Sequence, residues 1–361
     1  MAPSRTIITF GETSSPELSA LLNNFRDKVI LPTYLAREQR KKIYNPDLKQ
    51  ILQNDPVTME IDGVVHKFHY INQVEDLPNT NRTLWTAVSL MKTPADFRNL
   101  GPLLEGVERA QRKVLPGFWS KLIRHAGQHG AISVLLECIK VPDRTGFRLN
   151  THEVLAELLF VLQHQAINSG FDEATTKNAL RQIQLVLNLI ESNKAHWPQK
   201  LSRGAKLAYP LHRDPQMLAA KLHMAAARAV YHKDGKDEDG KVSDLAEQLI
   251  ALWPENTGLL DLQSADAARF RYEGLRYLAN YNQYLRMISP LLNGLNLAVP
   301  LVDPALGMQL QNRADAVDNE VKHALKSEKR RQGGWGEFVY NQIFNPDAVT
   351  PEDVEKYTYK A

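Results

Sequence analysis

The sequence contains a single cysteine, Cys138, among its 361 residues. One thiol excludes a disulfide within the chain, and it also excludes a zinc site built on several thiolates. Cys138 lies among the apolar residues of the segment 132–139, a position typical of a buried core thiol rather than of a nucleophile.

Long hydrophobic runs are also missing. No apolar stretch reaches the roughly 18 residues that a bilayer-spanning helix needs. The most apolar segment, Leu291–Val302, is interrupted by Asn293, Asn296 and Pro300. We therefore expect no membrane span.

Motifs that carry catalytic chemistry are scarce. The sequence has no glycine-rich phosphate loop followed by Lys-Ser or Lys-Thr, and no G-x-G-x-x-G after an expected strand. His152 lacks a second histidine one turn on, because Ala156 stands there, so a zinc-protease motif is excluded. His125 and His129 are one turn apart but have no further ligand nearby in the sequence. The sequence predicts a protein that is not an enzyme and has no cofactor, metal or small-molecule substrate.

Apolar residues recur at helical spacing through most of the chain, and 43% of the residues are hydrophobic, which suffices for a substantial core. One segment differs: Val57–Ile71 contains Asp62-Gly63, a strong signal for the two-residue turn of a β-hairpin. Helices are expected at 16–26, 33–44, 46–54, 215–231, 242–253, 264–288 and 304–331, with nearly continuous helical hairpins over 80–191. We interpret the aromatic residues of 264–288 as core packing rather than as a surface that stacks RNA bases.

The segment Pro116–Asn150 forms one complete helix-turn-helix pattern. The first helix carries an apolar face, Gly130 stands where it must stop, and Gly146 marks the exit turn after a second apolar stripe. The face of the first helix consists of Phe118, Trp119, Leu122 and Ile123, and the stripe of the second consists of Ile132, Leu135, Leu136 and Ile139. Such a hairpin cannot bury both faces alone, so it needs similar neighbours stacked beside it.

In these residues the segment resembles a pentatricopeptide repeat, an RNA-binding helical repeat of organelles. The resemblance implies that Ser120 and Asn150 occupy the two positions at which the family reads an RNA base. Two residues depart from the family pattern: Leu149 replaces its usual proline, and Leu135 replaces a small residue at the helix crossing.

Neighbouring windows match this pattern less well. The window Asn81–Leu115 has Ala95 where the turn glycine would stand, and the hairpin that begins at Thr151 exceeds the repeat period. A degenerate array argues against base-by-base reading, which needs several consecutive regular repeats.

The fold class that follows is a mainly α protein, a pentatricopeptide- or tetratricopeptide-like α-solenoid with one small β-hairpin and extended termini. We expect N-terminal helices with the β-hairpin in 1–79, pentatricopeptide-like hairpins in 80–197 and a C-terminal helical array in 198–332. Residues 333–361, which begin with Gly333-Gly334-Trp335-Gly336, are expected to form an extended tail. Trp197–Pro210 is interpreted as a basic connector.

The net charge is only +3, but the basic residues are clustered. One cluster near the start of the chain and a second near its end are candidate contacts for RNA phosphates. The candidates are Arg37, Arg40, Lys41 and Lys42, and then Lys326, Lys329, Arg330 and Arg331. A solvated helix face that only keeps the protein soluble would explain the same residues.

Residues 1–10 contain Arg5, hydroxyl residues and no acid, which fits the end of a mitochondrial presequence. As a whole the chain resembles fungal mitochondrial ribosomal proteins with degenerate helical repeats. The resemblance implies a structural component of the mitochondrial ribosome in the matrix, with the small subunit favoured and with rRNA and ribosomal proteins as partners. Two alternatives remain: an mRNA-binding translational activator of the organelle, and a tetratricopeptide-type scaffold that binds proteins.

Overall fold

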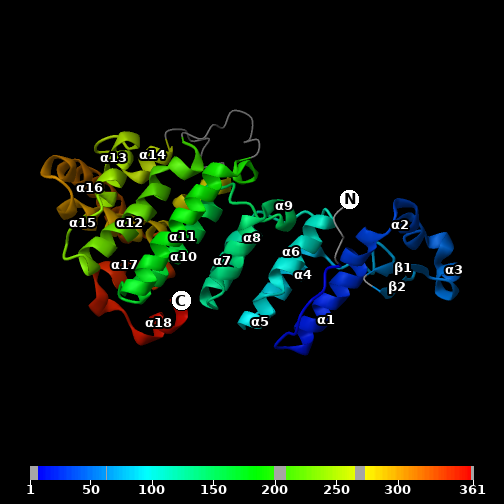
Figure 1. Ribbon diagram of the computed structural model, residues 1–361. Helices are drawn as coiled ribbons and strands as arrows, with labels where there is room; N and C mark the ends of the chain where they lie inside the picture. The colour runs from blue at the N-terminus through cyan, green and yellow to red at the C-terminus, as the bar shows by residue number, and fades with distance from the viewer. Residues whose placement is uncertain (1–6, 62, 199–208, 265–272, 359–361) are drawn as a thin grey trace. The chain divides into compact units, whose positions relative to one another are not determined.

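The computed structural model describes residues 7–61, 63–198, 209–264 and 273–358, and it is mainly helical (Figure 1). Contacts divide the chain into two compact units, residues 1–148 and residues 149–361. In the described residues the only sheet has two antiparallel strands. The prediction of a mainly α protein with one β-hairpin is therefore confirmed.

Unit 1, residues 1–148, begins with α1 (Pro16–Phe25). Ser15 caps this helix by accepting a hydrogen bond from the Leu18 backbone, and Pro16 fits the first turn, where no N–H partner is needed. The other elements of the unit are η1 (Arg26–Ile30), η2 (Leu31–Tyr34), α2 (Arg37–Ile43), η3 (Pro46–Leu48), α3 (Lys49–Asn54), β1 (Val57–Ile61), β2 (Val64–Phe68), α4 (Thr80–Leu90), α5 (Pro94–Phe97), α6 (Leu100–Arg109), α7 (Gly117–Gln128), α8 (Ile132–Lys140) and α9 (Pro142–Thr145).

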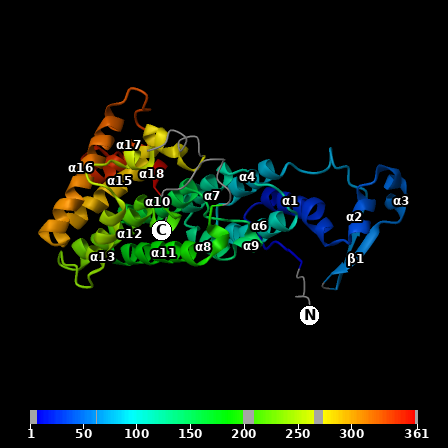
Figure 2. The same ribbon diagram turned by 90° about the horizontal axis from the view of Figure 1, so that it is seen from above.

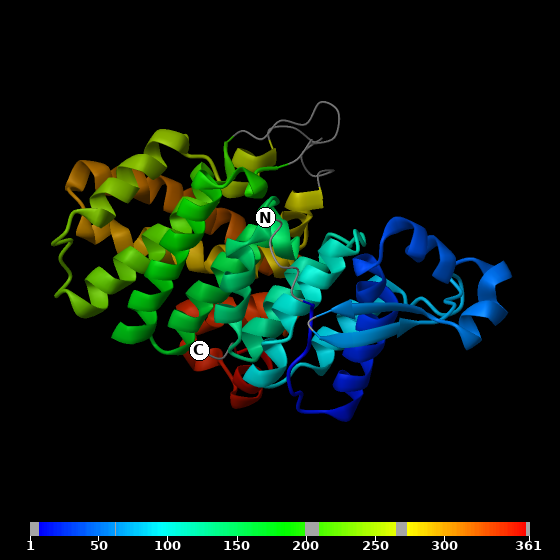
Figure 3. The same ribbon diagram turned by 45° about the vertical axis from the view of Figure 1, so that its right-hand side comes forward.

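The β-hairpin packs with α2 and α3 at one end of unit 1 (Figures 2 and 3). Its register pairs Val57 with Phe68, and Gly63 takes the positive φ of 78° that the tight turn requires. A small core of Leu31, Leu35, Ile43 and Phe68 holds this part together.

The helix expected at 33–44 begins later, at Arg37. Residues 31–34 form a 3₁₀ turn, and Leu35 and Ala36 are extended, with ψ angles of 145° and 152°. The extended backbone allows Leu35 to enter the small core, so tertiary packing overrides the local helical pattern.

The helix-turn-helix expected in Pro116–Asn150 is present as α7 and α8. Gly130 lies in the turn with φ +69°, and Gly146 ends α9 with φ +68°, as the sequence predicts. The apolar faces are fully buried at Leu122, Ile123 and Leu135. Contacts of α7 with α4, and of α8 with α6, supply the neighbouring helices that such a hairpin needs.

Unit 2, residues 149–361, is built around α12 and α15, which pack on each other. Its elements are α10 (His152–Asn168), α11 (Glu173–Ser192), η4 (Lys194–His196), η5 (Leu211–Arg213), α12 (Pro215–His232), α13 (Lys241–Leu252), α14 (Leu259–Ser264), η6 (Glu273–Ala279), α15 (Tyr281–Ala298), η7 (Val299–Leu301), α16 (Pro304–Lys326), α17 (Trp335–Phe344), η8 (Pro346–Ala348) and α18 (Pro351–Tyr357). A buried ion pair joins α10 to α15: Arg286 donates to both oxygens of Glu157 at 2.7 Å.

The expected helix at 264–288 is wrong in its extent. Residues 265–272 lie outside the described part of the chain, η6 is a 3₁₀ helix, and Asn280 caps a new helix, α15. Tyr277 and Tyr284 are nevertheless buried, which confirms core packing for these two aromatic residues.

The extended tail expected after residue 332 is also wrong, because residues 335–344 form α17 and residues 351–357 form α18. Phe338 and Val339 of α17 are buried, and the helix packs on α15. Gly336 permits this packing, since a Cβ there would lie 2.1 Å from the carbonyl oxygen of Asn282. The glycines that suggest a break therefore allow a close helix contact.

No helix in the described ranges is long and apolar enough to cross a membrane. Most of the expected connector Trp197–Pro210 falls on residues 199–208, which are not described. The division at 79/80, 197/198 and 332/333 stays a prediction of how the chain is organised.

Candidate nucleic-acid interface

Positive charge is concentrated in unit 1. Residues 1–148 contain 20 Lys and Arg against 15 Asp and Glu, a net charge of +5, whereas residues 149–361 contain 24 against 26, a net charge of −2. A polyanion would therefore be attracted mainly to unit 1, and in unit 2 only to places where cations gather locally.

The four cations of the first predicted cluster all lie on α2 and are exposed. Lys41 forms an ion pair with Glu38 at 3.1 Å, whereas Arg37, Arg40 and Lys42 have no carboxylate within pairing distance among the described residues. The charges of Arg37, Arg40 and Lys42 are therefore available to an external partner.

Helix stability explains part of this cluster. Arg40, Lys41 and Lys42 occupy the last turn of α2, where cations interact favourably with the helix dipole by about 0.3–1 kcal/mol each. Arg37 occupies the first turn, where a positive charge is unfavourable. Arg37 therefore does not stabilise α2 through the helix dipole. Its exposed charge is better explained by contact with an anionic partner.

The small core of unit 1 fixes the orientation of α2. Ile43 is buried there, and its carbonyl oxygen accepts a hydrogen bond from Ile71 at 2.8 Å. Burial raises the pKa of Tyr44, while the nearby Arg112 and Arg40 act to lower it. Arg112, distant in sequence, therefore lies with the α2 cluster, and no local sequence pattern identifies it as a member.

The second predicted cluster divides into exposed and buried members. Lys326, Lys329 and Arg331 are exposed, at the end of α16 and just after it. Arg330 points inward: its side chain is only 9% exposed, pairs with Glu337 and donates to the Leu325 carbonyl at 3.2 Å. Arg330 joins the end of α16 to the start of α17 and is the least available of the eight candidates.

Glu337 is suited to this pairing. Burial acts to raise its pKa, but hydrogen bonds from Arg330 and from the Gly333 backbone lower the pKa below its ordinary value. The carboxylate therefore stays ionised beside the guanidinium.

The two positions suggested for base reading differ in accessibility. Ser120 is 1% exposed inside unit 1, and its hydroxyl has no hydrogen-bond partner among the described residues. Asn150 is half-buried and belongs to unit 2. The burial of Ser120 gives no support to base reading, which stays a prediction for this pair.

One feature that the sequence does not reveal is an exposed aromatic residue beside a cation. Trp85 on α4 is 39% exposed, and the Lys121 ammonium lies 5.5 Å from the centre of its ring. Aromatic rings flanked by cations can stack unpaired bases. The sequence pattern assigns Trp85 no role, and the structure identifies it as exposed.

The remaining polar candidates have structural roles. His125 and His129 bond to the backbone oxygens of Met91 and His125, each at 2.9 Å, and the described residues contain no group of three or more metal-binding side chains. Burial raises the pKa of the Cys138 thiol to about 12, with Glu105 and Glu137 adding to the effect. Cys138 is therefore a core thiol, as predicted.

A mainly helical scaffold that presents separate groups of exposed cations is typical of a structural protein associated with RNA. Residues 1–342 match the family model described as mitochondrial ribosomal protein mS27. The chain is also 38% identical over 352 residues to the small ribosomal subunit protein mS27 of Neurospora crassa, an alignment that covers 93% of this chain and 88% of the relative. The chain belongs to the mitochondrial ribosomal protein mS27 family.

Membership in this family confirms the identification made from the sequence, including the favoured small subunit. The protein is a structural component of the mitochondrial ribosome rather than an enzyme.

Proposed function

We propose that the chain holds ribosomal RNA in the small subunit of the mitochondrial ribosome, in the matrix, through exposed cations on α2 and around the end of α16. The residues on α2 are Arg37, Arg40, Lys41 and Lys42, and the residues near the end of α16 are Lys326, Lys329 and Arg331. The observation that carries the proposal is that, within the described ranges, Arg37, Arg40 and Lys42 are exposed without a carboxylate partner in a unit of net charge +5.

We further propose that the helices are arranged as a degenerate solenoid whose surfaces contact neighbouring ribosomal proteins. Within unit 1, α4 contacts α7 and α6 contacts α8; within unit 2, α10 contacts α12. Contacts between helices that are not consecutive in the chain are expected for stacked hairpins, which supports this arrangement. The exposed Val64 and Val65 of β2 are suited to contact with a protein neighbour.

The test uses charge variants of the full chain and measures binding to single-stranded RNA at several salt concentrations. Arg37→Gln/Arg40→Gln should weaken binding and lower the slope of log K against log salt by roughly 0.7 for each phosphate that is no longer neutralised. Lys92→Gln/Arg98→Gln removes two exposed cations of the same unit outside the clusters and serves as the matched control. Equal effects of the two pairs would contradict a specific role for α2.

The same variants discriminate between the alternatives. Arg37→Gln/Arg40→Gln should also reduce the fraction of the protein that sediments with a ribonuclease-sensitive particle. If Ser120→Ala/Asn150→Ala instead abolishes binding to one particular RNA, while the charge variant stays in the particle, the translational activator replaces this proposal. Sedimentation unchanged by ribonuclease would favour the protein-binding scaffold.

A further inference from the structure

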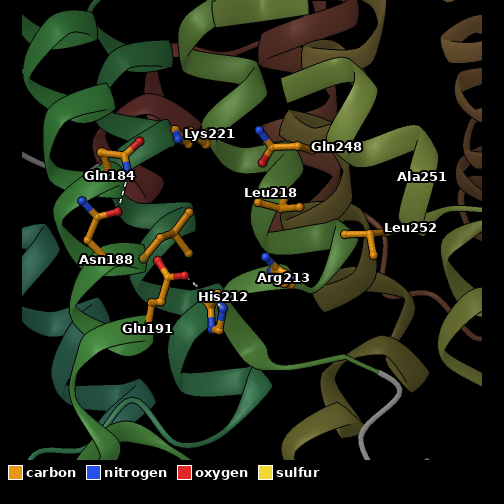
Figure 4. A pocket seen from close by; sticks show the side chains of 11 residues that line it. Gln184, Asn188, Glu191, His212, Arg213, Leu218, Lys221, Gln248, Ala251 and Leu252 are labelled. Atoms are coloured by element: carbon orange, nitrogen blue, oxygen red, sulfur yellow. Dashed lines mark hydrogen bonds and ion pairs between the residues drawn. The ribbon is translucent and has the colours of Figure 1, made fainter. Parts of the chain in front are cut away.

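A groove of about 360 Å³ lies in unit 2 between α11, α12 and α13 (Figure 4). Two of its walls come from the second helices of successive hairpins, α10–α11 and α12–α13, and η5 contributes His212 and Arg213. The volume is near the lower end of the range of about 300–1,000 Å³ that is usual for small-molecule sites. The groove therefore has room for one small ligand.

The lining combines an apolar surface with side-chain amides. Leu187 and Leu218 are buried residues that contribute apolar surface to the groove. Gln184 donates a hydrogen bond to Asn188 at 2.5 Å, and Figure 4 shows the two side chains together on the α11 wall. Whichever of the two amides donates, the pair keeps three N–H donors and one carbonyl oxygen that accepts no bond within the pair, so it offers both the donors and the acceptor that the edge of a nucleobase requires.

Two cations of the groove lack an internal counterion. Lys221 and Arg213 have no carboxylate within pairing distance in the described parts of the chain. Burial lowers the pKa of Lys221, and the positive charge of Lys241 lowers it further. The carboxylate in the lining, Glu191, lies 3.9 Å from His212 and is largely exposed. An anionic ligand would supply the charge that Lys221 and Arg213 lack.

The cationic lining continues along α11. Lys177 and Arg181 are exposed and line a second surface hollow together with Glu173, but neither cation has a carboxylate within pairing distance among the described side chains. They precede Gln184 and Asn188 at spacings of three or four residues, so all four side chains lie on one face of the helix. Because unit 2 has a net charge of −2, these cations are a local concentration rather than a general excess.

We propose that this groove binds one unpaired nucleotide of RNA. The Gln184–Asn188 pair contacts the base edge, Leu187 and Leu218 contact the base face, and Lys221 and Arg213 bind the phosphate. Lys177 and Arg181 bind the phosphates of the strand that leaves the groove along α11. Only the source of the nucleotide, ribosomal RNA, is taken from the proposed function; the binding of a nucleotide is inferred from the groove itself.

The experiment measures binding of two probes to the full chain: adenosine monophosphate and a single-stranded RNA of about nine nucleotides. Lys221→Met keeps the aliphatic stem and removes the charge, and it should weaken both probes about tenfold or more, since a hydrogen bond to a charged group contributes about 1.5–3 kcal/mol. Lys236→Met, at an exposed lysine between α12 and α13, should change neither affinity. Circular dichroism verifies that both variants fold.

A second variant separates a free nucleotide from an RNA strand. Lys177→Gln/Arg181→Gln should weaken only the oligonucleotide, and its salt slope should be smaller by roughly 0.7 for each phosphate left without a cation. If it weakens neither probe, the groove accepts free nucleotides and the RNA assignment is wrong.

The proposal would be overturned if oligonucleotide binding were unaffected by Lys221→Met. It would equally be overturned if a peptide of several glutamates bound in a Lys221-dependent manner while neither nucleotide probe did, because the groove would then be a protein-docking site. Arg37→Gln/Arg40→Gln should leave binding of the monophosphate unchanged. A groove that binds the monophosphate, together with an α2 variant that retains full association with the particle, would support the groove and refute the proposed role of α2.

Discussion

Unit 2 should lose stability between pH 7.5 and pH 5 because it buries two neutral histidines. Burial lowers the pKa of both His164 and His223 to about 3, and the positive charge of Arg286 adds to the effect at His164. His164 is enclosed by the stacked ring of Phe160 and by a 3.0 Å hydrogen bond to Gln342 of α17. Neither ring can be protonated without disrupting its buried surroundings.

The sign of the effect follows from proton binding. In the unfolded chain a histidine has its ordinary pKa of about 6.5, so below that pH the unfolded state binds protons that the folded state does not. The stability contributed by the neutral rings is complete above pH 6.5 and falls as the pH decreases toward 3. At pH 5 the linkage relation gives a loss of about 2 kcal/mol for each histidine, or about 4 kcal/mol for the pair, against a total domain stability of about 5–15 kcal/mol.

The assay is denaturant unfolding of the full chain at pH 7.5 and pH 5, with His164→Gln/His223→Gln as the comparison. The variant will be less stable at pH 7.5, but its unfolding free energy should change less between the two pH values than that of the native protein. Burial raises the pKa of Glu320, so this carboxyl also affects the pH dependence, but it is present in both proteins and its contribution cancels in the comparison. An equal pH dependence in native protein and variant would refute the reasoning.

Three further changes test other parts of the structure. Arg286→Met leaves the Glu157 carboxylate buried without its partner and should lower the free energy of unfolding in urea by about 3–5 kcal/mol. A decrease of less than about 1 kcal/mol would show that the pair is not desolvated. Gly130→Val should lower the free energy of unfolding by about 1 kcal/mol or more, because valine is strained at φ +69°, and an unchanged melting temperature would show that the turn is misplaced. Cys138 should react with iodoacetamide at pH 8 only after unfolding, since the thiol is buried with its pKa at about 12, and rapid labelling of the native protein by mass spectrometry would contradict this.

Local turn chemistry made much of the fold predictable. Gly63, Gly130 and Gly146 lie where the sequence predicts tight turns, and each of these three glycines has a positive φ. Such signals depend on one residue and its own backbone, so they do not require knowledge of distant contacts. The helices after Asp214 and Asp303 are predictable for the same reason, because the cap and the following proline are adjacent in sequence.

The errors occurred where distant contacts decide the structure. The pattern of Trp335, Phe338 and Val339 has helical spacing, but the preceding glycines suggest an extended tail. Packing of α17 on α15 determines the outcome, and the partner residue Asn282 is more than fifty positions away in sequence. Similarly, Leu35 is extended rather than helical because its side chain packs in a core with Phe68.

For the candidate RNA interface, the sequence supplies charges but not their availability. Arg330 and Arg331 are adjacent and chemically identical, yet one is nearly buried against Glu337 and the other is exposed. A pairing seven residues away cannot be inferred from a count of cations, because it depends on the turn between α16 and α17.

The groove of unit 2 shows that the sequence can also fail to indicate a cation that belongs to a site. Lys221 belongs to an alanine-rich helix in a unit of net negative charge, so neither composition nor clustering draws attention to it. Its importance comes from α11, whose amides line the same groove from the neighbouring hairpin. Sequence clusters therefore identify cations that can attract a polyanion at long range, whereas a site that holds one nucleotide requires groups which only the packing of three helices brings together. On this argument, variants of α2 should change how steeply RNA binding depends on salt, whereas the Gln184–Asn188 pair should affect which base is preferred.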